Sequence, residues 1–126
     1  MYPKKKENLK FVLSDAFIDD DGKPIEWEMR ELTAEEGVEV RKQLSFGEDP
    51  VKTLAMFVGE SLVVPDLHNQ ELLEELSRIK GRPIFTAGEA LLAILTNTLI
   101  GRLCAIYKQY NDLDTDIGEL IDRLKK

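Results

Sequence analysis

The feature that most constrains the fold is a change of hydrophobic period near residue 32. From Ile25 to Met29, apolar residues alternate with charged ones, a period of two that predicts a strand with one buried face. From Thr33 to Leu44, the apolar positions recur at spacings of three and four, which predicts a helix. A chain that changes period within a few residues needs both a sheet and helices, so we expect an α+β fold.

Residues 9–32 predict a β-hairpin with a tight connection. Phe11, Leu13 and Phe17 share one face of the first predicted strand. Between the strands, "DDDGKP" contains aspartates that can bond to their own backbone and Gly22, which is free to take a positive φ. This segment therefore favours a turn.

Five or six short helices are expected after the hairpin. Each predicted start has a capping residue before an apolar stripe, at Thr33, Asp49, Asn69 and Thr86, with a last helix from about Asp116. The stripe from Val51 to Leu62 is the clearest, and Pro65 is expected to end that helix. Residues 90–95 are apolar all round and predict a central helix, with a break near Asn97 and Thr98.

The chain is expected to form one domain. Its 126 residues can bury a single core, and no stretch resembles an interdomain linker. The basic cluster Lys4 to Lys6 lies at the N-terminus, so residues 1–8 are expected to form a flexible, solvated tail of the 1–126 domain.

Charge and hydropathy argue against two classes of partner. With 17 basic and 24 acidic residues, the net charge of −7 opposes binding to a phosphate backbone, so no nucleic acid partner is expected. The apolar run from Ala90 to Gly101 is too short to span a bilayer, so no membrane partner is expected. The single cysteine, Cys104, rules out an internal disulfide, and a cytoplasmic protein is the simplest expectation.

No catalytic, metal or cofactor site is predicted, so we do not expect an enzyme. Gly22 and Glu28 have the spacing of a calcium loop, but its first ligand position would be Phe17, which has no side-chain oxygen. His68 is the only histidine, and Cys104 is expected to be a buried structural thiol. Neither residue has an evident catalytic partner.

The segments "FIDDDGKPIEWEMRELTAEEGVEVRKQ" and "VVPDLHNQELLEEL" resemble the XkdN-like phage tail assembly chaperones. The similarity lies in the order of a strand, an acidic turn, a second strand with Glu-Trp and a Thr-capped helix, followed by a proline-containing loop and a leucine-bearing helix. The tail "IYKQYNDLDTDIGELIDRLKK" is similar in layout to that family's C-terminal helices.

This resemblance implies an assembly factor of a tailed phage or prophage that is absent from the virion. It implies binding to the tape measure protein, with the major tail tube protein as a possible further partner. A small acidic protein with an apolar groove could mask an apolar stripe on such a client and keep the complex soluble. A structural or adaptor protein that self-associates and stays in the tail is the alternative, and a misread enzyme or metal protein is a third hypothesis.

Two regions are predicted to bind the partner. One is a second apolar side of the 51–62 helix, formed by Met56 and Phe57. The other comprises Ile106, Tyr107 and Tyr110 near the C-terminus. Apolar residues at helical spacing are more often core than groove, so a core position is the competing interpretation for each of them.

Overall fold

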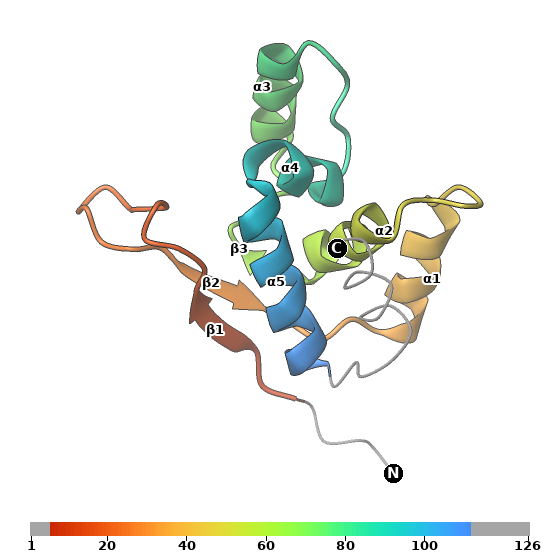
Figure 1. Cartoon of the computed structure of the whole chain (residues 1–126), viewed down its shortest axis with the longest axis horizontal. Helices are drawn as coiled ribbons and strands as arrows, with labels where there is room; N and C mark the ends of the chain where they lie inside the picture. Colours follow the sequence, from red (N-terminus) through yellow and green to blue (C-terminus); the bar gives the residue numbers. More distant parts are fainter. Residues whose placement is uncertain (1–5, 112–126) are drawn as a thin grey trace.

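The computed structural model describes residues 6–111 and confirms the α+β fold, with three strands and five helices (Figure 1). The elements in order are β1 (Leu9–Val12), β2 (Glu26–Met29), α1 (Ala34–Lys42), α2 (Pro50–Ser61), β3 (Leu62–Val64), α3 (Gln70–Lys80), α4 (Ala87–Ile94) and α5 (Asn97–Tyr110). The helix predicted from Asp116 lies outside the described residues.

The predicted hairpin is confirmed, although its connection is longer than expected. Strands β1 and β2 are antiparallel, with Phe11 opposite Trp27. The chain between them forms a projecting arm whose tip is the acidic turn (Figure 1). There the Asp19 carboxylate accepts hydrogen bonds from the backbone of residues 21 and 23, and Gly22 has a φ of 78°. The aspartates therefore build a turn, as the sequence predicts.

The third strand was not predicted from the sequence. Leu62 was expected in the preceding helix, but α2 ends at Ser61 and Leu62–Val64 pairs with β2 to give the order β1-β2-β3. A short apolar run fits a helix or a strand equally well by periodicity alone. Its pairing depends on a strand more than thirty residues earlier, which local sequence does not reveal.

The predicted helix caps are confirmed. Thr33 forms the full capping box with Glu36, and Asp49, Asn69 and Thr86 each accept backbone hydrogen bonds at the first turn of their helices. The break before α5 falls slightly earlier than expected, because Thr96 is the capping residue. These agreements arise because caps depend on neighbouring residues only.

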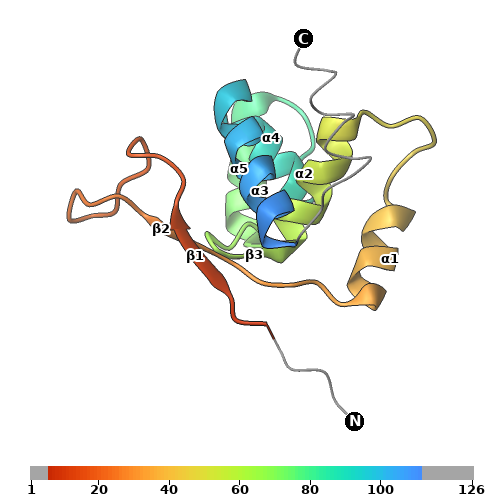
Figure 2. The same ribbon diagram turned by 60° about the horizontal axis from the view of Figure 1, so that its bottom comes forward.

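Helices α2, α4 and α5 lie over one face of the sheet, while α1 lies beyond the end of β2 (Figure 2). Trp27 and Met29 point from β2 into a single buried cluster that also contains Leu54 of α2, Leu91 of α4 and Leu103 of α5. This arrangement confirms the period-two prediction for β2, whose other face carries the glutamates.

Residues 6–8, expected to belong to a flexible tail, make specific contacts. The Lys6 ammonium lies 4.3 Å from the centre of the Tyr110 ring, and the Tyr110 hydroxyl donates a hydrogen bond to the Glu7 carbonyl at 2.8 Å. The Asn8 side chain donates to Glu28. Lys6 and Glu7 are thus held to the end of α5, a contact between distant residues that composition could not indicate.

Helices α2 and α4 cross with their backbones in close contact. A Cβ atom added to Gly59 would lie 2.5 Å from the backbone nitrogen of Gly88, and one added to Gly88 would lie 2.6 Å from the Cα atom of Met56. Real Cβ atoms essentially never approach backbone so closely, so the crossing requires glycine at both positions.

We expect Gly59→Ala to destabilise the protein by about 1–3 kcal/mol, because the helices must separate to admit the methyl group. The matched control is Gly37→Ala in α1, where the nearest atom to the new Cβ would be 3.5 Å away on the Arg41 side chain. That change should stabilise the protein by up to about 1 kcal/mol through helix propensity. Urea denaturation would measure both. Equal effects would mean that the crossing tolerates separation.

One ion pair joins the sheet to α1. The Arg30 guanidinium, at the end of β2, donates to both carboxylate oxygens of Glu36, and the Arg30 backbone N–H donates to the Ser61 carbonyl at 2.8 Å. The hydrogen bond from Arg30, helped by the Thr33 backbone N–H, lowers the pKa of Glu36 to about 2. This pair orients α1 against the end of the sheet.

The lowered pKa of Glu36 means that its stabilising contribution is present above pH 4.5 and is lost as the pH falls toward 2. Because both side chains are about one-third exposed, we expect Glu36→Gln to cost only about 1 kcal/mol at neutral pH. Glutamine preserves the capping box, so the change isolates the charge. Denaturation at a series of pH values should show this cost vanishing in acid, whereas a cost independent of pH would contradict the ion-pair explanation.

Candidate functional site

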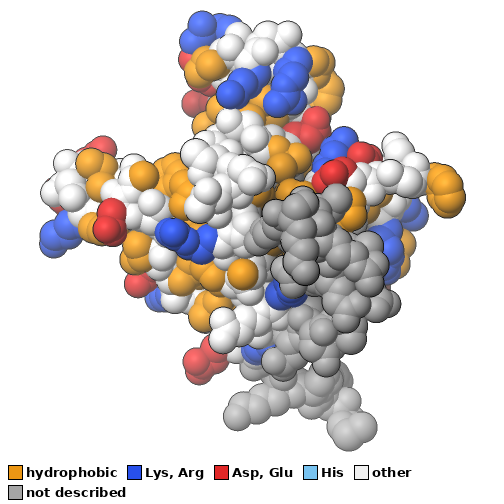
Figure 3. Space-filling view, in the orientation of Figure 1, with side chains coloured by type: hydrophobic (Ala, Val, Ile, Leu, Met, Phe, Trp, Pro, Cys, Tyr) orange, Lys and Arg blue, Asp and Glu red, His pale blue; other side chains and the backbone are white. Residues whose placement is uncertain are grey.

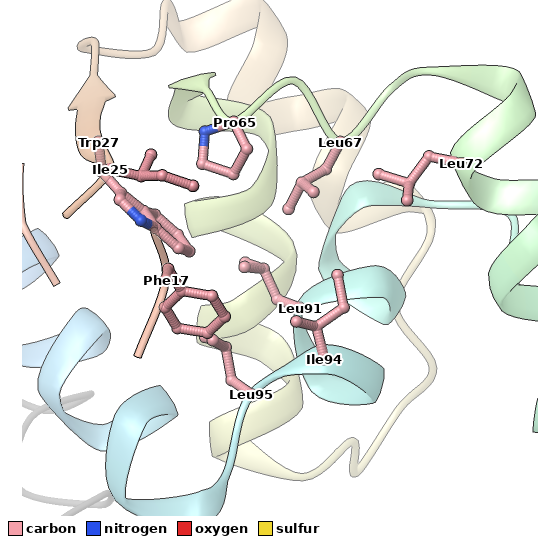
Figure 4. Close-up of a pocket in the computed structure, with 9 residues that line it drawn as sticks. All are labelled: Phe17, Ile25, Trp27, Pro65, Leu67, Leu72, Leu91, Ile94 and Leu95. Atoms are coloured by element: carbon pink, nitrogen blue, oxygen red, sulfur yellow. The ribbon is translucent and has the colours of Figure 1, made fainter. Parts of the chain in front are cut away.

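The candidate site is an apolar pocket between the hairpin arm and the α3–α4 end of the molecule. Its volume is about 190 Å³. In the space-filling view, hydrophobic side chains gather in the notch between these two arms (Figure 3). Nine apolar residues line it: Phe17, Ile25, Trp27, Pro65, Leu67, Leu72, Leu91, Ile94 and Leu95 (Figure 4).

The hairpin supplies one wall of the pocket. Ile25 and Trp27 share a face of the strand region because they are two residues apart, and Phe17 reaches the same face from the other side of the arm. The Phe17 and Trp27 rings meet edge to face, with centroids 5.8 Å apart. Phe11 supports Trp27 from β1, at 6.2 Å between centroids. This aromatic packing gives the wall a defined shape.

The helices supply the opposite wall. Leu91 and Ile94 project from neighbouring positions on α4, and Leu72 comes from the first turn of α3 (Figure 4). The Ser77 hydroxyl joins α3 to the start of the α4 segment, because it accepts a hydrogen bond from the Ile84 N–H at 2.9 Å and donates to the Leu73 carbonyl. The two helices that bear this wall are thereby held together.

The lining suits binding of an apolar group. A cavity of about 150 Å³ with a similar aliphatic and aromatic lining can hold a benzene-sized molecule. The pocket can thus take one large apolar side chain. Its walls contain no titratable group, and residues 6–111 contain no cluster of three or more potential metal ligands.

The residues predicted to bind a partner occupy other positions. Met56, Tyr107 and Tyr110 are buried, each less than 10% exposed, so they offer little surface. Burial raises the pKa of both tyrosines, and the nearby Glu31 carboxylate adds to the effect at Tyr110. Phe57 and Ile106 are half-buried and pack against the core. None of the five lines the pocket.

The sequence indicates several pocket residues one by one but not that they meet. The period-two pattern of residues 25–29 predicts that Ile25 and Trp27 share a buried strand face, and Leu72 lies in the leucine-bearing helix that follows the proline loop. The structure brings lining residues together from positions as far apart in the sequence as Phe17 and Leu95. A proline-containing loop followed by a leucine-bearing helix was the nearest available signal, since Pro65, Leu67 and Leu72 all come from it.

The other two residues that could carry chemistry, His68 and Cys104, do not line the pocket. The His68 ring lies 3.0 Å from the Glu60 carboxylate on the surface, and Cys104 is buried in the core. In the described part of the chain, no helix is long and apolar enough to cross a membrane.

Comparison with known proteins identifies a fold neighbour. No protein-family model matches the chain, and no curated protein matches it in sequence. The chain is similar to the crystal structure of the protein YqbN, with a TM-score of 0.70 over 89% of this chain and 90% of that one. The sequence identity is 17%, so the similarity shows a shared fold.

Proposed function

We propose that this protein is a tail assembly chaperone of a tailed phage or prophage. In this role it binds the tape measure protein in the bacterial cytoplasm and keeps it soluble while tail tube subunits assemble around it. It does not remain in the mature virion. Neither catalysis nor a cofactor is required.

The observation that carries the proposal is an open apolar pocket on a strongly acidic protein. A long helical client with an exposed apolar stripe tends to aggregate, and covering that stripe needs an apolar site on the partner. The net charge of −7 keeps the resulting complex soluble. Because a pocket of about 190 Å³ takes only one side chain, binding would be moderate in strength and reversible, as release of a client requires.

The pocket also comes largely from the segments that resemble the XkdN-like chaperones. The first segment contributes Phe17, Ile25 and Trp27, and the second contributes Pro65, Leu67 and Leu72. Six of the nine lining residues therefore lie where the family resemblance lies. This coincidence supports a shared binding role for the two segments.

Co-expression with the tape measure protein of the same phage genome tests the proposal. We expect the two proteins to co-purify as a soluble complex, while the tape measure protein expressed alone is insoluble. Affinity capture followed by size-exclusion chromatography with light scattering gives the stoichiometry. Capture no stronger than that of an unrelated helical protein would contradict the proposal.

Mass spectrometry of purified virions separates this role from the alternative. A chaperone should be absent from the particles. Presence at a constant copy number, together with symmetric self-association of the free chain, would instead indicate a structural or adaptor protein of the tail.

A further inference from the structure

Negative charge is concentrated in the segments that form the pocket. Residues 14–27, 65–76 and 84–95 carry all nine lining side chains. They contain ten of the 24 acidic residues of the chain but only one of its 17 basic residues, Lys23. All of these acids except Glu89 are exposed.

Most of these acids are not neutralised by the rest of the described structure. Within residues 6–111, only Asp66 and Glu75 of the ten lie within ion-pair distance of a basic side chain. The basic residues of α3, Arg78 and Lys80, lie in its last turn, whereas Leu72, which lines the pocket, lies in the first. The chain segments that line the pocket are therefore predominantly acidic.

We propose that the pocket binds a single bulky apolar side chain, phenylalanine, leucine or methionine, from a partner segment in which lysine or arginine flanks that anchor. The inference rests on the proposed function, because it describes the segment of the client that is recognised. The volume sets the size of the anchor, and the apolar lining excludes a polar one. The acidic character of the segments that form the pocket, with Glu71 next to Leu72 in the first turn of α3, favours basic flanks and would repel an acidic segment.

Synthetic peptides test this inference directly. The probe is a short tryptophan-free peptide with one phenylalanine flanked by lysines. Trp27, the only tryptophan of the chain, lies in the pocket wall, so its emission should change when the anchor enters. Replacing the phenylalanine with alanine should weaken binding about tenfold or more. Replacing the lysines with glutamates should weaken it strongly at low salt, and salt should weaken binding of the lysine peptide.

Two pairs of variants test the two parts of the inference. Ile94→Lys places a charge at the pocket in a residue that is already 38% exposed, and Ile79→Lys is its control on a 62% exposed site outside the lining. We expect affinity for the lysine peptide to fall about tenfold in the first variant and less than twofold in the second.

Glu71→Lys and Glu35→Lys each reverse the charge of the second residue of a helix, α3 and α1 respectively. Only Glu71→Lys, beside Leu72, should weaken the lysine peptide, by about fivefold.

Circular dichroism confirms that each variant is folded before binding is measured. Equal binding of the lysine and glutamate peptides, or equal effects within either pair of variants, would overturn the inference. Self-association abolished by Ile94→Lys but not by Ile79→Lys would also overturn it, because a second copy would then be the occupant.

The outcomes for the inference and for the proposed function are distinct. If the tape measure protein co-purifies but no peptide binds the pocket, the chaperone proposal stands and the recognition inference fails. If the lysine peptide binds as expected but the tape measure protein does not co-purify, the pocket chemistry stands and the identity of the client is wrong.

Discussion

The close crossing of α2 and α4 at Gly59 and Gly88 is the contact on which the rest of the structure depends. Because the two backbones touch there, the end of α2 and the start of α4 have little freedom to shift. The chain leaves α2 directly into β3, which completes the sheet, and α4 carries Leu91 and Ile94 into the pocket. The contact between Gly59 and Gly88 thus fixes the position of the sheet wall of the pocket relative to its helical wall.

The pocket is an apolar opening beside the buried core. Around it, aromatic and aliphatic side chains from every element except α1 pack together, and the described residues leave no buried polar side-chain atom without a hydrogen-bond partner. An open apolar hollow in such a protein is more informative than scattered exposed residues such as Phe46, which are common on soluble proteins. The acidic segments that form it narrow the kind of partner that it can accept.

Sequence reasoning succeeded where the physical cause is local. The Thr33–Glu36 capping box, the Asp49 cap and the Asp19–Gly22 turn each depend on residues within a few positions of one another. It failed at β3, whose pairing partner is distant. For the candidate site, the sequence indicated the contributing faces one by one. It did not indicate that Met56 and Tyr107 would be covered while Ile25 and Leu72 would border an opening.

The sequence by itself determined the α+β class, the hairpin, the positions of the helix starts and the acidic character, because hydrophobic period, capping chemistry and charge are properties of neighbouring residues. Only the tertiary structure decided which apolar faces are buried against one another and which meet around an empty volume. Burial depends on the approach of elements that are far apart in the chain, and that approach depends on backbone contacts such as the one between Gly59 and Gly88. An apolar stripe looks the same in sequence whether a neighbouring helix covers it or leaves it open.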